Sequence, residues 1–140
     1  MSVEVKYKTS STASGGRDGS SRTEDGRLDV RLSTPTELGG SGGDGTNPEQ
    51  LFATGYAACF LSALKLVART MKIDMADASV KAIVGIGPSS DGGYGLTVEL
   101  VTNAPGLSRE DAERVVHAAH QTCPYSNATR GNIDVQLTIA

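Results

Sequence analysis

Tryptophan, cysteine and basic tracts are scarce or absent in this sequence. Of its 140 residues two are cysteine and none is tryptophan, and 13 Lys and Arg stand against 16 Asp and Glu, for a net charge of −3. Two cysteines are too few for a disulfide-stapled secreted scaffold. Without a basic patch we expect no electrostatic binding of nucleic acid or of a membrane. Because no basic and apolar leader opens the sequence, we expect a cytoplasmic protein whose two thiols serve either packing or chemistry.

The chain length indicates one domain, residues 1–140, because domains usually span about 100–200 residues. A glycine-rich segment at 39–45 is typical of a flexible surface loop. It does not indicate a domain boundary, since the 38 residues before it fall below the roughly 40 that usually fold alone. The longest uncharged apolar stretch, 51–64, is shorter than the about 20 residues that span a bilayer and has the length of a buried core helix.

A long helix is predicted at 48–70. Asn47 can cap its N-terminus, Pro48 suits the first helical position and Gln50 stands where a capping box needs Glu or Gln. Because apolar residues lie on all sides of this helix, we expect it to be enclosed on all sides.

A second helix is predicted at 109–122, with Ser108 as its cap, Asp111 completing a capping box and Pro124 ending it. Residues spaced three or four apart form its buried face: Ala112, Val116, Ala119 and Cys123. Cys123 is therefore expected at the C-terminal edge of that face, neither deep in the core nor on the solvent side.

Five segments alternate apolar and polar residues with a period of two, which predicts strands. Their apolar positions are Val3, Val5 and Tyr7; Leu28, Val30 and Leu32; Val80, Ala82, Val84 and Ile86; Leu96, Val98 and Leu100; and Ile133, Val135, Leu137 and Ile139. The Asp-Gly-Gly sequence at 91–93 predicts a hairpin turn between the third and fourth strands. The order of strands and helices predicts an α+β fold with a mainly antiparallel sheet.

Cys59 lies in the middle of the first helix, where a lone cysteine more often packs as a small apolar residue than reacts. Burial raises the pKa of a thiol, so a nucleophilic Cys59 needs a cation nearby. Its own helix offers none within a turn, because Lys65 is six residues away. The cation would have to come from another element.

A metal site is the competing use of the cysteines. His117, His120 and Cys123 recur every three residues and would form a Cys2His2 set with Cys59. This spacing matches no established zinc pattern, and at about 100° per residue the three side chains on the second helix fan over about 120° of its surface. The two histidines therefore fit solvated helix residues better than metal ligands.

Two longer segments carry a family resemblance. NPEQLFATGYAACF (47–60) and CPYSNATRGNIDV (123–135) closely resemble the two signature segments of the organic hydroperoxide resistance proteins, the Ohr branch of the OsmC-like superfamily. The GGRDG segment at 15–19, the chain length and the element order extend the likeness over essentially the whole chain. The resemblance implies an OsmC-like fold, with antiparallel β-sheets around a long buried central helix and a second helix, in an intertwined homodimer.

The same resemblance implies a thiol peroxidase that reduces organic hydroperoxides to alcohols. In the family pattern Cys59 attacks the peroxide, and Cys123 resolves the resulting sulfenic acid as a disulfide. The family's arginine falls on Arg17 and its glutamate on Glu49, whereas Thr54 stands where many members carry alanine. An external dithiol re-reduces the disulfide, typically a dihydrolipoyl group on a lipoylated carrier protein, and the cycle needs no metal, haem or flavin.

The chemistry of the residues agrees with these roles. Arg17 lies among glycines that permit its loop to bend, keeps its charge, and can both lower the pKa of Cys59 and stabilise the departing alkoxide. Glu49 can accept a bidentate hydrogen bond from Arg17 and hold it in place. Apolar neighbours of Cys59 predict substrate-binding residues for greasy substrates such as fatty-acid hydroperoxides: Leu51, Phe52 and Phe60.

Glu49 and Cys59 are ten residues apart on one predicted helix, about 15 Å along its axis. If both serve one site, either the helix breaks near Gly55 or Glu49 comes from a second subunit. We favour the second subunit, because a symmetric dimer would cover the apolar helix and place two sites at the interface.

Two other functions stay open at this point. One is a peroxidase of the neighbouring OsmC branch with a different substrate preference, although the second motif favours the Ohr branch. The other is a non-catalytic dimeric binding protein in which both cysteines are core residues.

Overall fold

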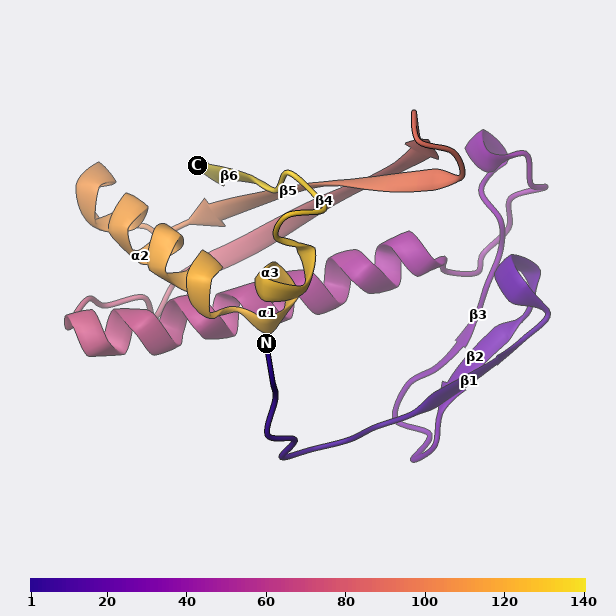
Figure 1. Ribbon diagram of the computed structural model, residues 1–140, viewed down its shortest axis with the longest axis horizontal. Helices are drawn as coiled ribbons and strands as arrows, with labels where there is room; N and C mark the ends of the chain where they lie inside the picture. Colours follow the sequence, from indigo (N-terminus) through magenta and orange to yellow (C-terminus); the bar gives the residue numbers. More distant parts are fainter. The chain divides into compact units, whose positions relative to one another are not determined.

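Contacts within the chain divide it into two units, Met1–Pro48 and Glu49–Ala140. The structure, a computed structural model, describes all residues from 1 to 140 (Figure 1). The single domain expected from the chain length stays a prediction.

The first unit holds a three-stranded antiparallel sheet of order β1-β2-β3. Its strands are β1 (Ser11–Ser14), β2 (Ser20–Thr23) and β3 (Asp29–Arg31), with 3-10 turns η1 (Gly16–Asp18) and η2 (Thr36–Leu38). The strand predicted around Leu28, Val30 and Leu32 is confirmed as β3. The polar β1 and β2 have no apolar face, so the alternation of residue types did not reveal them.

The strand predicted around Val3, Val5 and Tyr7 is wrong. These side chains are 73%, 57% and 78% exposed, and the residues before Ser11 form no strand. Ser11 pairs with Thr23, where β2 ends. Residues 3–7 therefore lie beyond the end of β2, which is the strand that pairs with β1. Without a neighbouring strand in this unit they have no partner for strand hydrogen bonds, and the alternation of residue types cannot replace that partner.

The glycine-rich segment at 39–45 is a loop, as expected, and hydrogen bonds connect it to residues 33–35; its flexibility stays a prediction. The Gly40 N–H donates to the Pro35 oxygen at 3.0 Å, and the Gly45 N–H donates to the Ser33 Oγ at 2.9 Å. A Cβ atom on Gly45 would lie 2.5 Å from the Ser33 backbone nitrogen. The absence of a side chain therefore permits this close approach of two backbone segments.

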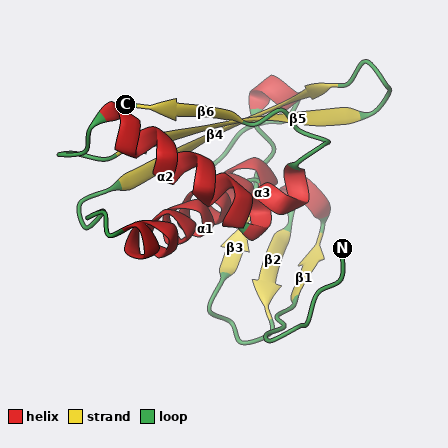
Figure 2. Ribbon diagram, turned by 60° about the vertical axis from the view of Figure 1, so that its left-hand side comes forward, coloured by secondary structure: helices red, strands yellow, loops and turns green.

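The second unit consists of three helices and a second three-stranded sheet. The elements are α1 (Pro48–Met71), β4 (Ser79–Pro88), β5 (Tyr94–Asn103), α2 (Arg109–Thr122), α3 (Pro124–Thr129) and β6 (Gln136–Ile139), and the sheet order is β4-β5-β6. Both long helices pack on the same face of this sheet (Figure 2). The helices predicted at 48–70 and 109–122 are confirmed as α1 and α2.

The β4–β5 hairpin has the predicted turn. Ser89 N–H donates to the Gly93 oxygen at 2.9 Å, and Gly92 N–H donates to the Ser89 oxygen at 3.1 Å. Gly92 and Gly93 have φ values of 95° and 70°, which favour glycine. The fifth predicted strand is confirmed as β6, but it pairs with β5 in parallel, because the α2–α3 crossover returns the chain in the direction of β5.

The core of the second unit lies between α1, α2 and the sheet. Buried residues of α1 recur at helical spacing: Tyr56, Phe60, Ala63, Leu64 and Ala68. They pack against Val98 and Leu100 of β5 and against Val115, Val116 and Ala119 of α2. The Ser108 side chain caps α2 by accepting a hydrogen bond from the Asp111 N–H at 3.1 Å, as predicted, and the Asp111 carboxylate pairs with Arg114 at 3.0 Å.

The other elements of the second unit cover only one face of α1, although the sequence predicts enclosure on all sides. Leu66 on the other side is 53% exposed. The 24 residues of α1 are long and apolar enough to cross a membrane by length and composition, but only 28% of the apolar window is buried in the chain. The core helix of a soluble protein passes the same test, so this property is weak evidence for a membrane.

Candidate active site

The two cysteines, remote in sequence, lie side by side in the second unit. Cys59 projects from α1, and Cys123 lies between α2 and α3, with 3.5 Å between their Sγ atoms. Both are free thiols, and the Cys123 thiol donates a weak hydrogen bond to the Cys59 sulfur. Because a disulfide bond is about 2.05 Å long, an approach of about 1.5 Å would join them. The geometry permits a reversible dithiol–disulfide couple.

The cysteines differ in accessibility, in the opposite sense to the sequence-based expectation. Cys59 is only half-buried, whereas Cys123 is fully buried and belongs to the core. The predicted position of Cys123 at the edge of a buried face is therefore wrong. The reason is α3, which starts directly after Cys123 and packs against α2. The accessible thiol can meet a substrate while the buried one is shielded from it.

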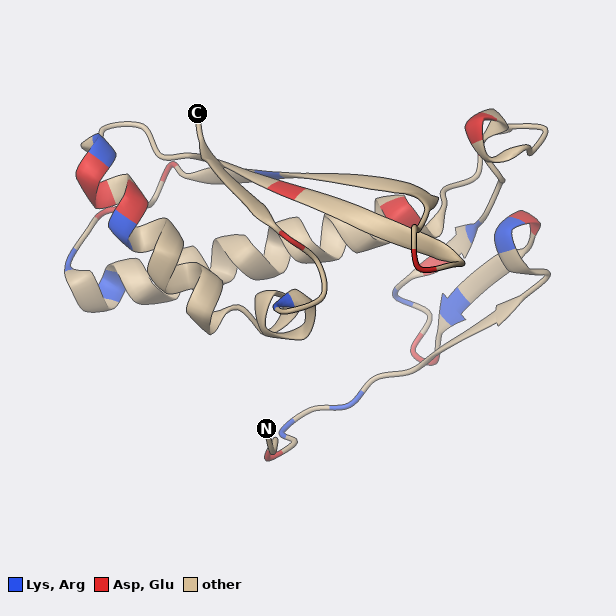
Figure 3. Ribbon diagram, turned by 45° about the horizontal axis from the view of Figure 1, so that its top comes forward, with Lys and Arg blue, Asp and Glu red and all other residues tan.

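The surroundings of Cys59 in this unit do not activate it. Burial raises the pKa of the Cys59 thiol, a hydrogen bond from the Tyr125 backbone N–H lowers it, and the adjacent Cys123 raises it again. No charged residue lies between Glu49 and Lys65 in the sequence of α1, and most of the long helix is drawn in the colour of uncharged residues in Figure 3. As expected from the sequence, a cation that stabilises the Cys59 thiolate has to come from another element.

Aromatic side chains lie beside the cysteine pair. The Tyr125 ring lies 5.6 Å from that of Tyr56 and 6.2 Å from that of Phe52, measured between centroids. Gly55 permits this packing, because a Cβ atom there would lie 2.9 Å from the Tyr125 hydroxyl oxygen. Tyr125 is 40% exposed, and its backbone N–H donates a hydrogen bond to Cys59, so this residue links the aromatic side chains to the accessible thiol. The sequence carries no periodic signal that singles out Tyr125.

The predicted substrate residues do not share one environment. Leu51 and Phe52 are half-buried, whereas Phe60 is fully buried in the core cluster of its own chain. A substrate could reach Phe60 only if the core opened. The structure therefore corrects Phe60 from a substrate contact to a core residue, because its position on α1 faces the sheet.

The helix α1 is continuous from Pro48 to Met71, so it does not break at Gly55. Glu49 lies in its first turn, ten residues before Cys59, and these residues are therefore about 15 Å apart along the axis. Of the two alternatives, only the supply of Glu49 by a second subunit stays open, as a prediction. Arg17 lies on η1 in the first unit, and its role at Cys59 likewise stays a prediction.

The histidines do not join the cysteines in a metal site. His117 is exposed, while His120 is half-buried and its Nδ1 lies 2.8 Å from the Ser126 Oγ. No group of three or more His, Cys, Asp or Glu side chains could hold a metal ion. The competing Cys2His2 arrangement is therefore not assembled.

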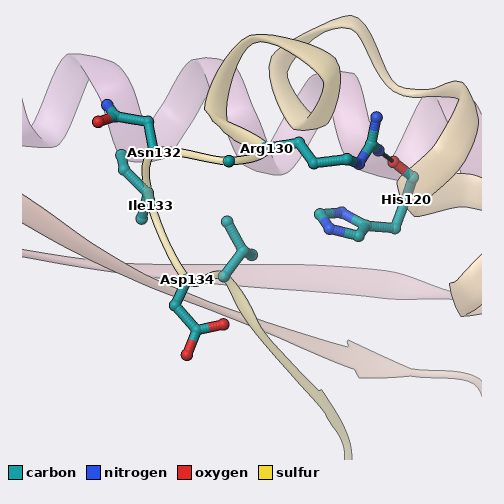
Figure 4. A pocket seen from close by; sticks show the side chains of 7 residues that line it. His120, Arg130, Asn132, Ile133 and Asp134 are labelled. Atoms are coloured by element: carbon teal, nitrogen blue, oxygen red, sulfur yellow. Dashed lines mark hydrogen bonds between the residues drawn. The ribbon is translucent and has the colours of Figure 1, made fainter.

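A cavity of about 370 Å³ lies beside His120 and includes neither cysteine. It is lined by His120, Arg130, Gly131, Asn132, Ile133, Asp134 and Val135 (Figure 4). Arg130 donates hydrogen bonds to the His120 carbonyl oxygen and, at 2.7 Å, to the Asn127 side chain. The bond to His120 connects the C-terminal end of α3 to the last turn of α2, whereas the bond to Asn127 stays within the end of α3.

Known proteins resemble this chain along nearly its whole length. A family model described as OsmC-like protein matches residues 40–138. An organic hydroperoxide resistance protein of Xanthomonas axonopodis pv. citri is 54% identical over 138 residues, which cover 98% of this chain and 96% of that protein. The crystal structure of one from Legionella pneumophila is 47% identical, with a TM-score of 0.93 and coverage of 98% and 99%. That of OhrB from Bacillus subtilis is 46% identical, with a TM-score of 0.88 and coverage of 96% and 98%.

These likenesses bear on the fold and on the family of the chain. The expected OsmC-like α+β fold is confirmed, with two small sheets and a long helix. Identities near 50% over almost the full length place the chain within one branch of that fold. The chain belongs to the organic hydroperoxide resistance proteins of the OsmC-like family.

Proposed function

We propose that this protein is a thiol-dependent peroxidase that reduces organic hydroperoxides, fatty-acid hydroperoxides included, to the corresponding alcohols. The observation that carries the proposal is the 3.5 Å distance between the Sγ atoms of an accessible and a buried cysteine. Relatives that share about half of the residues are named for organic hydroperoxide resistance, which supports a peroxide-detoxifying role.

The cycle starts at Cys59. Its thiolate attacks the outer oxygen of the hydroperoxide, the O–O bond breaks, and the alkoxide leaves and takes up a proton to become the alcohol. Cys59 is then a sulfenic acid. The Cys123 sulfur attacks the Cys59 sulfur, a disulfide forms, and the hydroxide leaves as water with the Cys123 proton. An external dithiol exchanges with this disulfide and restores both thiols.

Activation of Cys59 is assigned to Arg17 and its orientation to Glu49. Because burial raises the pKa of Cys59, a guanidinium that always carries its charge is suited to oppose this effect. In the transition state the same charge stabilises the developing alkoxide. We assign these residues to a homodimer, in which a second copy covers the exposed side of α1 around Leu66 and supplies Glu49 to the site.

The substrate and the reductant follow from the surroundings of Cys59. Leu51, Phe52 and the part-exposed Tyr125 ring that lies against Phe52 are apolar groups of the unit that holds the accessible thiol, which favours an alkyl hydroperoxide over hydrogen peroxide. The proposed reductant is a dihydrolipoyl group on a carrier protein in a reducing cytoplasm. The two thiols complete the cycle without a metal, haem or flavin.

Thiol counting tests the proposal. The reduced protein is treated with one equivalent of cumene hydroperoxide, and free thiols are counted over time. We expect a rapid loss of two thiols per chain, abolished in Cys59→Ser, and a much slower loss with hydrogen peroxide. Persistence of both thiols over minutes would instead support a non-catalytic binding protein, and faster reaction with hydrogen peroxide would favour the substrate preference of another branch.

A further inference from the structure

Four polar side chains next to the cysteines form a hydrogen-bonded group that the peroxidase cycle does not use. The Tyr56 hydroxyl lies 2.9 Å from the Ser126 Oγ and 3.3 Å from the Thr129 Oγ1, and the Ser126 Oγ lies 2.8 Å from the His120 Nδ1. Tyr56 and Ser126 are fully buried. We call the hydrogen-bonded series formed by Tyr56, Ser126 and His120 the Tyr56–Ser126–His120 chain.

Each cysteine has members of this hydrogen-bonded group three residues away in the sequence. Tyr56 lies three residues before Cys59 on α1, while His120 and Ser126 lie three residues before and after Cys123. Ser126 therefore connects all three helices at the point where the two sulfurs meet. The Arg130 hydrogen bond to the His120 carbonyl oxygen adds a second link between α2 and α3.

The backbone of Cys123 is hydrogen-bonded to both of the helices that it joins. Its backbone N–H donates to the Ala119 oxygen of α2 at 2.8 Å, and its carbonyl accepts from the Asn127 N–H of α3 at 2.9 Å. Its own backbone is extended, with φ −63° and ψ 124°, which separates the two helices. The position of its sulfur therefore depends on how α2 and α3 are fastened to α1.

The Ser126 hydroxyl can satisfy both of its partners. Burial first, then Arg130 and His117, lower the pKa of His120, which favours a neutral ring near pH 7. With the proton on Nε2, Nδ1 accepts from the Ser126 O–H while the Ser126 oxygen accepts from the Tyr56 O–H. Loss of the Ser126 hydroxyl would leave the buried Tyr56 O–H with Thr129 as its hydrogen-bond partner. The His120 Nδ1 would lose the hydrogen bond from Ser126.

We propose that the Tyr56–Ser126–His120 chain positions the resolving cysteine: it fastens α3 and the end of α2 to α1 and so sets the approach of Cys123 to the oxidised Cys59. This role rests on the proposed peroxidase cycle. It concerns disulfide formation and not the attack on the peroxide. A reaction within one molecule depends on how closely its groups are held near the reacting geometry, and the two sulfurs start about 1.5 Å from bonding distance.

Two rates measured on the full chain test this role. Stopped-flow consumption of one equivalent of cumene hydroperoxide reports the attack, and acid-quenched thiol counting reports disulfide formation. In Ser126→Ala we expect attack within about twofold of wild type and disulfide formation slowed about tenfold, which corresponds to about 1.4 kcal/mol. In Tyr56→Phe we expect a slowing of about fivefold. With excess cumene hydroperoxide, both variants should accumulate more Cys59 sulfinic acid.

Matched variants separate positioning from general packing. Ser62→Ala removes a hydroxyl from α1 that bonds only the Ala58 carbonyl, and Tyr94→Phe removes an exposed hydroxyl from β5; both should leave the two rates unchanged. At His120, asparagine keeps a polar atom near the Nδ1 position whereas leucine does not. His120→Asn should form the disulfide within about twofold of the wild-type rate. His120→Leu should slow disulfide formation as Ser126→Ala does.

Each outcome bears on a stated claim. Disulfide formation at the wild-type rate in both Tyr56→Phe and Ser126→Ala would overturn the positioning role. Equal rates in His120→Asn and His120→Leu would overturn it as well, and this pair decides if Ser126→Ala fails to fold. If the wild-type protein loses no thiols to the hydroperoxide, the peroxidase proposal fails and this inference fails with it. If the wild-type protein loses two thiols but the variants form the disulfide at its rate, only the positioning role fails.

Discussion

Replacing Arg17 by alanine tests whether this arginine stabilises the Cys59 thiolate. In the second unit burial raises the pKa of Cys59, and the Tyr125 N–H opposes this only in part. A free thiol has a pKa of about 8.5, so at pH 7 no more than about 3% of a Cys59 thiol in this environment would be thiolate. A peroxidase limited to that fraction would be slow.

The size of the effect follows from this fraction. If Arg17 makes the thiolate the main form at pH 7, its removal lowers the second-order rate constant for cumene hydroperoxide about 30-fold through the thiolate fraction alone. Loss of alkoxide stabilisation lowers it further. A missing cation shifts the pKa of Cys59 upward, so the difference between variant and wild type should narrow as the pH rises toward the new pKa.

The assay uses the Cys123→Ser background, so that a single thiol titrates. The ultraviolet absorbance of the thiolate gives the pKa of Cys59, and stopped-flow kinetics give the rate constant. Arg27→Ala is the matched control, because Arg27 lies in the same unit, pairs with Asp25 and has a 90% exposed side chain. An unchanged pKa of Cys59 together with an unchanged rate constant in Arg17→Ala would refute the role of this arginine.

Three further outcomes are expected. Cys123→Ser should consume cumene hydroperoxide without forming a disulfide and accumulate sulfinic acid on mass spectrometry, and sustained turnover with a dithiol would contradict the resolving role. Thr102→Val should raise the free energy of unfolding by about 1 kcal/mol in urea titrations, because the buried Thr102 hydroxyl has no hydrogen-bond partner; a decrease would contradict this. Gly19→Ala should lower the free energy of unfolding by about 2 kcal/mol or more, since the new Cβ would lie 1.7 Å from the Ser14 backbone oxygen. Gly87→Ala, with open space at the Cβ position, should change it by less than about 0.5 kcal/mol, and equal effects of both alanines would contradict the steric argument.

Elements with strong local signals were predictable. Both long helices carry helical apolar spacing, and Pro48 and Ser108 mark their starts. The strands β4 and β5 are ten residues long each, contain the alternating segments 80–86 and 96–100, and are joined by a glycine turn. The short α3 was missed although Pro124 stands at its first position, because proline ends one helix and begins another with equal ease.

Elements that depend on a partner were not predictable. The segment 3–7 alternates like a strand but has no neighbouring strand in its unit, whereas the polar β1 and β2 form strands because they pair with each other and with β3. The burial of Phe60 and of Cys123 likewise depends on what packs over them. Periodicity describes one element, and burial is a property of several.

The sequence by itself determined the two long helices, the β4–β5 hairpin, the family resemblance and the identity of the two cysteines. Only the tertiary structure decided that the Cys59 and Cys123 sulfurs lie 3.5 Å apart, that the first is accessible and the second buried, and that Ser126 connects the three helices around them. Caps and apolar spacing act within a few residues along the chain. The distance between two thiols 64 positions apart is set by the packing of α1, α2 and α3, which no local pattern contains.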